Sequence, residues 1–269
     1  MIRFWEELKA TDFGNTLSDR VAVLPLAAVE QHGPHLPLGV DSMIADHLVK
    51  TAATALPEES KALFLPLQRI ALSPEHQNFP GSLSGSWKTM GDFLTEIGAG
   101  VAKSGIRKLL LITSHGGNLA LMDIVGRELR AAHDMLVVST HWEKLGLPRK
   151  LPDTGTYTDI HGGEAETSIM LAIRPDLVDM SKAQDYASGQ SELKAKNKFL
   201  GFHSSPATIS WMAEDLNPLG VVGDASASNA ADGQAMIDAM VEGFCTLIAE
   251  IEKAAAPKKK GDLISQAAL

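Results

Sequence analysis

An apolar run that ends in acidic and histidine side chains constrains this fold more than any other stretch. Residues 21–28 are almost continuously apolar, which predicts a fully buried strand. The loop that follows carries Glu30, His32 and Asp41 among glycines and prolines, which are typical of loops. In open parallel α/β sheets, ligands bind outside the carboxyl ends of the strands. We therefore expect this segment to form half of a metal site at the edge of a parallel sheet.

Three further apolar runs repeat this arrangement along the chain. Strands are expected over residues 62–67, 108–113 and 135–140, and helical periodicity separates them over residues 42–55, 87–102 and up to residue 132. A histidine follows the end of each of the four strands within about ten residues: His32, His76, His115 and His141. Strands that alternate with helices in this way predict βαβ units, and so an α/β fold with a mainly parallel sheet.

The second half of the chain is less regular. Residues 158–173 start a helical pattern, residues 174–222 predict only short helices and a flap, and a final helix is expected over residues 234–254. No linker is long enough to divide the chain. We therefore expect a single domain over residues 1–255, followed by a polar tail over residues 256–269.

Composition excludes several classes of function. The net charge of −9 argues against a nucleic-acid partner, because such domains are usually basic. A single cysteine, Cys245, allows neither a disulfide framework nor a thiolate metal site within one chain. The N-terminus does not resemble a signal peptide, and no run approaches the roughly 20 apolar residues that span a bilayer. We expect a soluble, cytoplasmic protein with no membrane partner.

Oxygen and imidazole ligands recur where the sheet edge is expected. The candidate metal ligands are Glu30, His32, Asp41, His115 and one of the two glutamates at positions 164 and 166. Five such ligands can serve two divalent ions if one carboxylate bridges them, and the ions would neutralise carboxylates that otherwise repel one another. Ligation by nitrogen and oxygen alone fits Zn, Mn or Fe.

Each ligand also has a structural alternative. Asp41 sits where a helix N-cap is expected, and the acids near residue 165 can complement a helix dipole. His115 can be a turn residue beside Gly116 and Gly117, whose backbone can form an anion-binding nest. These alternatives leave open a non-catalytic binding protein for a small molecule or anion, and a single-metal isomerase or lyase. The convergence of four segments on one sheet edge favours the metal site.

Three further residues are candidates for catalysis or substrate binding. His161 lies near the candidate glutamates and is not needed to complete the ligand set, which makes it a candidate proton donor. His76 and Tyr157 are candidate substrate-binding residues. The chain lacks GxGxxG and GxxxxGK[ST] motifs, and GSLSG over residues 81–85 does not fit the GxSxG pattern of a nucleophilic serine.

Four ordered motifs resemble the creatininase family of metal-dependent amidohydrolases. They are EQHGPHLPLGVD (30–41), SPEHQNFPGSLS (73–84), SHGGN (114–118) and HGGEAETS (161–168), and GDASAS (223–228) is also similar to that family. The resemblance implies a three-layer α/β/α domain, a two-metal site that activates water, hydrolysis of a C–N amide-type bond, and a homo-oligomer, often a hexamer. It also implies that Glu30, Asp41 and His115 hold one metal. His32 would hold the second, with Asp41 as the bridge and His161 as the catalytic histidine.

Two positions depart from creatininase itself. Gly117 stands where creatininase has a glutamate ligand, as in the family's HGGN subgroup, so a glutamate of residues 161–168 must replace it, and we favour Glu166 over Glu164. Tyr157 stands where creatininase has a tryptophan that closes over the substrate. Both departures predict a substrate other than creatinine. The resemblance then implies a small amide, a formamide or a cyclic amide, with zinc as the expected metal and manganese or iron as alternatives. Relatives with the HGGN pattern include formamide hydrolases for pterin or flavin precursors and a peptidase of peptide-cofactor maturation.

Overall fold

A four-stranded parallel sheet forms the centre of the molecule. The computed structural model describes residues 2–13, 17–146 and 159–257. The strands lie in the order β2 (Ala62–Phe64), β1 (Val21–Leu26), β3 (Lys108–Thr113) and β4 (Leu136–His141). All neighbouring strands are parallel, and Leu26, Thr113 and His141 lie side by side at their carboxyl ends. This edge is where the sequence predicts ligand-binding groups.

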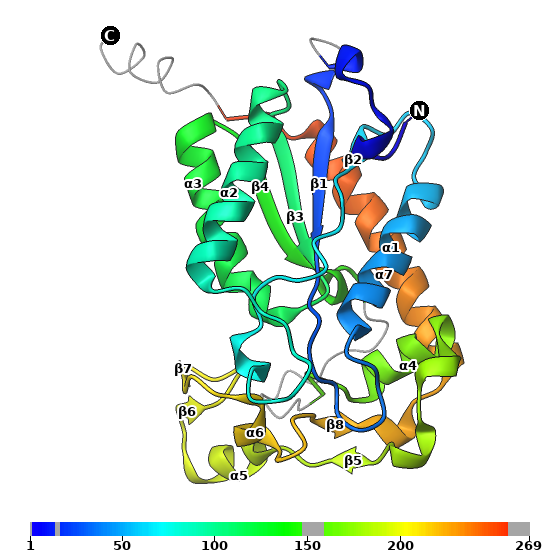
Figure 1. Cartoon of the computed structure of the whole chain (residues 1–269), viewed down its shortest axis with the longest axis vertical. Coiled ribbons are helices and arrows are strands. Elements are labelled where there is room, and N and C mark those ends of the chain that lie inside the picture. The colour runs from blue at the N-terminus through cyan, green and yellow to red at the C-terminus, as the bar shows by residue number, and fades with distance from the viewer. Residues whose placement is uncertain (1, 14–16, 147–158, 258–269) are drawn as a thin grey trace.

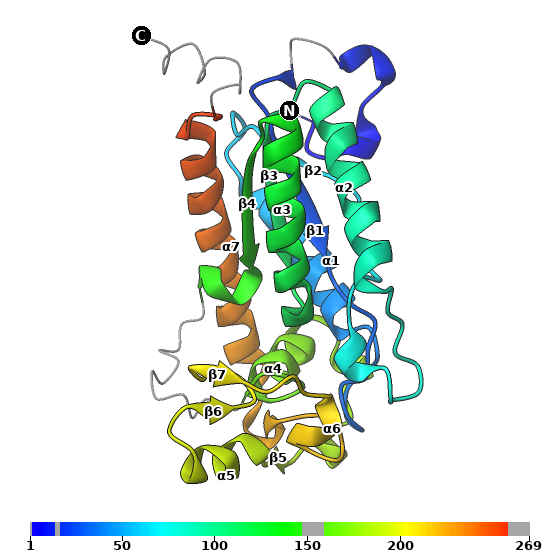
Figure 2. The same cartoon turned by 90° about the vertical axis from the view of Figure 1, so that its left-hand side faces the viewer.

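Helices cover both faces of this sheet. Helices α1 (Val40–Ala55), α4 (Glu164–Ile173) and α7 (Ala230–Lys253) share one hydrophobic core with Val21 and Val23 of β1. Helices α2 (Trp87–Lys103) and α3 (Leu119–His133) form the other core with alternate strand residues. Figure 2 shows β4 between α7 on one side and α3 on the other. The expected three-layer α/β/α architecture is confirmed.

Short elements gather at the end toward which β3 and β4 point (Figure 1). Strand β5 (Asp185–Tyr186) pairs antiparallel with β8 (Gly223–Asp224), and β6 (Leu200–Gly201) pairs parallel with β7 (Ala207–Thr208). Helices α5 (Gly189–Lys196) and α6 (Ala213–Leu216) lie between these strands in the sequence. The short helices expected over residues 174–222 are therefore present beside the carboxyl edge of the sheet.

Several element boundaries differ from the predictions. β1 ends at Leu26 and β2 at Phe64, each before its predicted end, because loop geometry begins while the sequence is still apolar. The N-terminal helical pattern forms two 3-10 turns, and α4 begins at Glu164 because two glycines precede it. Among the described residues, no helix is long and apolar enough to cross a membrane. The single domain over residues 1–255 stays a prediction.

The N-cap interpretation of Asp41 is wrong. Gly39 is the N-cap of α1, and Asp41 is the second residue of the helix. Its carboxylate is buried and therefore does not act as a solvent-facing cap. The position leaves this side chain available for the sheet edge, where Glu30 and His115 also lie.

Candidate metal centre

Loops and helix starts from four parts of the chain meet beyond the carboxyl ends of β1 and β3. They enclose a cavity of about 390 Å³. Four predicted site residues line it: Asp41, His115, His161 and Glu166. The other lining side chains are largely polar and include Ser114, His141, Glu143, Lys144, Asp159 and Ser204. The cavity therefore lies at the predicted place, and several titratable side chains line it.

Glu30, Asp41 and His115 form a first group of candidate ligands. Glu30 follows β1, Asp41 lies in the first turn of α1, and His115 follows β3. Each residue offers a ligand atom within 4.8 Å of those of the other two. Oε1 of Glu30 lies 3.1 Å from Nδ1 of His115, and all three residues are buried. Three convergent ligands at this spacing can hold one divalent ion.

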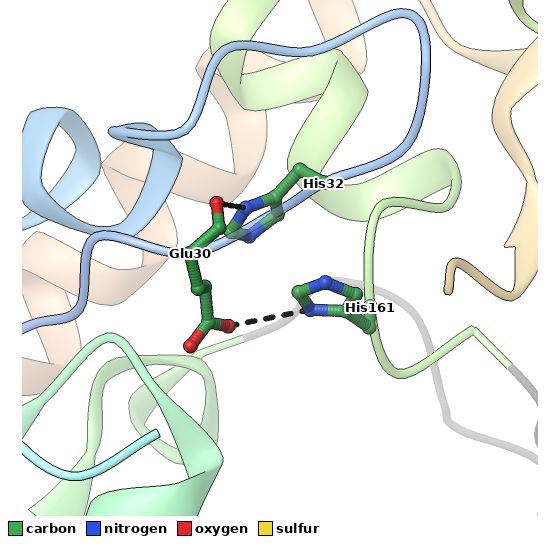
Figure 3. A group of neighbouring side chains, drawn as sticks. All are labelled: Glu30, His32 and His161. Atoms are coloured by element: carbon green, nitrogen blue, oxygen red, sulfur yellow. Dashed lines mark hydrogen bonds and ion pairs between the residues drawn. The ribbon is translucent and has the colours of Figure 1, made fainter. Parts of the chain in front are cut away.

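His32, Asp41 and Glu166 form a second group. Nε2 of His32 lies 3.7 Å from Oδ2 of Asp41 and 3.7 Å from Oε2 of Glu166. The other nitrogen of His32, Nδ1, hydrogen-bonds the Glu30 carbonyl oxygen at 3.0 Å (Figure 3). This hydrogen bond leaves Nε2 on the side of the two carboxylates. Asp41 belongs to both groups, which is the geometry that a bridging carboxylate requires. Glu166, and not Glu164, is part of this group.

Several of these buried atoms lack a hydrogen-bond partner among the described residues. They are both carboxylate oxygens of Glu30, Nε2 of His32, Oδ2 of Asp41 and Nε2 of His115, although Glu30 and His115 lie within ion-pair distance of each other. A buried polar atom without a partner usually costs about 1–3 kcal/mol, more for charged groups, and native proteins rarely tolerate several together. Cations bound to Glu30, His32 and Asp41 would satisfy their atoms, so the residues fit a metal centre.

The shifted pKa values of the candidate ligands also fit a metal centre. Burial, followed by the neighbouring Glu30 carboxylate, raises the pKa of Asp41 well above its ordinary value of 3.8. Burial opposes a charge on His32, but Glu166 and Asp41 raise its pKa to about 9. Protons therefore balance the crowded carboxylates when no cation does, and a divalent ion would displace them.

His161 lies between the two groups and faces the cavity. Its Nε2 lies 2.7 Å from the Gln31 carbonyl oxygen, and its Nδ1 lies 3.6 Å from Oε1 of Glu30 (Figure 3). Glu30, His32 and His161 form a third set of closely spaced ligand atoms. Burial and nearby His32 lower the pKa of His161 to about 4. This geometry accommodates a proton-transferring or a ligating histidine.

The structure describes only one of the two predicted substrate-binding residues, His76 and Tyr157. His76 is buried beside the metal centre, with Nε2 3.4 Å from Oε1 of Glu30 and Nδ1 2.9 Å from Nε2 of Gln31. It is not among the residues that line the cavity. Tyr157 lies outside the described residues. Substrate binding by either residue stays a prediction.

Two contacting residues escaped the sequence analysis. Oε1 of Glu75 lies 3.3 Å from Nε2 of His115. The side chain of Gln31 reaches His76 and donates to the Gly220 carbonyl oxygen at 2.6 Å. The available signal was adjacency in sequence, since Glu75 precedes His76 and Gln31 separates two candidate ligands. Adjacency alone does not reveal which way a side chain points.

Comparison with known proteins places this geometry in context. The sequence profile described as "Creatininase: Creatinine amidohydrolase" matches residues 6–248. The creatinine amidohydrolase of Pseudomonas putida is 32% identical over 199 residues, which cover 68% of this chain and 74% of that protein. The mycofactocin precursor peptide peptidase of Mycobacterium tuberculosis (strain ATCC 25618 / H37Rv) is 30% identical over 227 residues, covering 82% of this chain and 81% of that protein.

Solved structures resemble the whole fold. The structure titled "Creatininase Mn" superposes with a TM-score of 0.74 at 25% identity and covers 94% of this chain and 100% of that chain. A mutant creatininase whose title describes it as "Zn-Zn type" gives a TM-score of 0.72 at 25% identity, with 94% of this chain and 100% of that chain covered. Both similarities extend over nearly the whole of this chain.

Proposed function

This chain belongs to the creatininase family, and from that premise we propose that it is a metal-dependent amidohydrolase that cleaves a C–N amide-type bond with an activated water molecule. The observation that carries the proposal is the pair of candidate ligand groups that share Asp41 beside the cavity. Neither a helix cap nor a dipole-complementing acid requires such convergence.

Two divalent ions complete the proposed site. Glu30, Asp41 and His115 would hold one ion; His32 and Glu166, with Asp41 shared, would hold the other. The donor set of carboxylates and imidazoles suits Zn, Mn or Fe. Zinc is our first expectation, and similar structures carry Mn or Zn–Zn in their titles.

The ions would supply a water of lowered pKa and a polarised carbonyl, as in other two-metal hydrolases. The protein's own groups then have distinct tasks. The hydrogen bond from Nε2 of His161 to the Gln31 carbonyl oxygen assigns that nitrogen its proton and leaves Nδ1 toward Glu30 and the reacting groups. Nδ1 would take up a proton from the attacking water and pass it to the leaving nitrogen of the substrate. General acid catalysis of this kind typically contributes about 10²–10⁴-fold in rate.

The cavity suits a small polar amide. Its volume of about 390 Å³ matches a small molecule, and its walls carry Glu143, Lys144 and Asp159. A formamide, a cyclic amide or another small amide fits these dimensions, and we expect creatinine to be a poor substrate. We also expect a cytoplasmic homo-oligomer, hexameric as the family resemblance implies.

The test starts from protein purified without a chelator. Elemental analysis should find two divalent ions per chain, and chelation should abolish hydrolysis of an active amide in a panel of formamides, cyclic amides and short peptides. The product should contain one added water molecule. Absence of bound metal in folded protein would favour a non-catalytic binding protein, and an isomeric product without added water would favour an isomerase.

A further inference from the structure

His115 has a charged partner on each side of its ring. Nδ1 lies 3.1 Å from Oε1 of Glu30, in the first ligand group, and Nε2 lies 3.3 Å from Oε1 of Glu75. The side chain of Glu75 is only 14% exposed and that of His115 only 6%. The contact between Glu75 and His115 is therefore largely shielded from water, where electrostatic interactions are strong.

Gly117 provides the space for Glu75. A Cβ atom at Gly117 would overlap both with Oε1 of Glu75 and with Nε2 of His115. The backbone of Gly117 is not in the left-handed region, so its conformation alone does not require glycine. Gly116 differs, because a Cβ atom there would meet nothing within 4 Å. The missing side chain at position 117 thus leaves room for a carboxylate from another loop.

The turn that carries Glu75 also supports Glu30. Glu75 and His76 are consecutive in the 3-10 turn Pro74–His76, and Nε2 of His76 lies 3.4 Å from Oε1 of Glu30. Asn118 anchors the nearby Leu72 by accepting its N–H at 3.0 Å, and donates to the Ala27 carbonyl oxygen at 3.1 Å. One turn, fixed to the end of β1, therefore contacts two ligands of the first group.

We propose that Glu75 is a positioning residue for His115. Its carboxylate would accept the N–H of Nε2, which leaves Nδ1 unprotonated and directed at the ion held with Glu30 and Asp41. Histidine ligands usually donate their other ring N–H to such a partner, and loss of the partner typically costs about 10–100-fold in metal affinity. This inference rests on the proposed function, because it requires an ion at the first group.

The experiment titrates metal-free variants with Zn²⁺ against a competing chelator. In Glu75→Ala, one of the two Zn²⁺ affinities should fall about 10–100-fold while the other stays within a few-fold of wild type. Glu75→Gln should lose less, because its amide oxygen can still accept the N–H. The control is Glu214→Gln. Glu214 accepts a hydrogen bond from Asn78, which lies in the loop that carries Glu75, but Glu214 does not contact His115. Urea unfolding of the metal-free variants checks that the fold is retained.

Substitutions at Gly116 and Gly117 provide a second test of the same proposal. Gly117→Ala should weaken the same Zn²⁺ site, because its Cβ atom would push Glu75 and the ring of His115 apart, whereas Gly116→Ala should leave both Zn²⁺ affinities unchanged. The double variant Glu75→Ala/Gly117→Ala should bind Zn²⁺ at this site no more tightly than Glu75→Ala, because the added methyl group still overlaps with His115 when Glu75 is absent.

The outcomes separate the two proposals. Wild-type protein that binds no Zn²⁺ would overturn the proposed function. Wild-type protein that binds two ions, together with a folded Glu75→Ala variant that binds both as tightly, would overturn the role of Glu75 and leave the proposed function intact. A Gly117→Ala variant with unchanged affinities would equally overturn the positioning role.

Discussion

Asp41 lies in the first turn of α1, where acidic residues often interact only with the helix dipole. Here the carboxylate is buried and lies within reach of both ligand groups. The same residue type at the same helix position thus has a different role, because the loop before it returns the chain to the sheet edge. The consequences can be tested one side chain at a time.

Asp41→Asn should lose both metal ions. The neutral amide is a weaker ligand, and this single position contributes to both groups. Elemental analysis of purified protein measures the result. Asp46→Asn is the matched control, because Asp46 lies on the same helix but pairs with Lys50 and Arg69 at the surface. Full metal content in Asp41→Asn would contradict the shared ligand.

His161→Ala should lower kcat by about 10²–10⁴-fold while both ions stay bound. The imidazole faces the cavity, and its Nδ1 is the proposed proton carrier. Steady-state kinetics and metal analysis on the same sample measure both quantities. His133→Ala, at an exposed position on α3, should match wild type. If metal content falls together with kcat, His161 is a ligand and the proposed acid must be sought elsewhere.

At the scale of residues, the sequence predicted which candidate ligands would converge better than it predicted the residues around them. Glu30, His32, Asp41, His115 and Glu166 were expected at one place and lie together. Glu75 and Gln31 were not expected, because their roles depend on loop conformations that fix side-chain direction over long sequence separations. No local pattern encodes that direction.

At the scale of elements, the packing of α7 against α4 keeps Glu166 in place. Gly233, near the start of α7, lies against the backbone of α4, and a Cβ atom there would overlap with the Ser168 carbonyl oxygen. Since α4 also carries Glu166, a shift of this helix would move a candidate ligand. The helix pair therefore links the stability of one core to the geometry of the metal centre.

Gly233→Ala should destabilise the protein by about 1–3 kcal/mol, as over-packing in well-packed cores does. It should also weaken Zn²⁺ binding at the group that contains Glu166. Urea unfolding and Zn²⁺ titration measure the two effects. Gly100→Ala is the control, because a Cβ atom at this exposed site in α2 meets nothing. That variant should gain about 0.5–1 kcal/mol from helix propensity. Equal stability in the two variants would contradict the close α4–α7 contact.

At the scale of the whole molecule, the sequence predicted the central sheet and its helices better than the short strands beside the cavity. The strong apolar runs and helical periodicity located the four parallel strands, and the residues of β3 were predicted without error. The family resemblance is confirmed by the profile match. The short strands beside the cavity were not predicted, because two-residue pairings such as β5 with β8 depend on neighbours in space.

Metal-free protein should lose stability as pH rises from about 6.5 to 9. His32 has a folded-state pKa of about 9 against an ordinary value of 6.5, so its contribution is fully present below 6.5 and is lost as pH rises through about 9. The pKa of His115 is raised well above 6.5, mainly by Glu30 against the effect of burial, and shifts stability in the same direction.

Urea unfolding with a chelator, compared with unfolding in saturating Zn²⁺, measures this dependence. The loss should be confined to the metal-free protein, because bound ions replace the protons on the imidazoles. His32→Gln should flatten the profile of the metal-free protein. If the free energy of unfolding of metal-free wild-type protein did not change across this pH range, the histidines beside the carboxylates would not be retaining those protons.

The proposed ligands are spread from residue 30 to residue 166, which has a consequence during synthesis. A growing polypeptide that has passed only β4 still lacks the carboxylate of α4, and so it cannot complete its second cation site. On a ribosome, capture of the second cation must therefore wait until Glu166 has emerged, whereas the first group is complete once His115 is present. A fragment that ends before α4 would therefore hold at most one of the two cations.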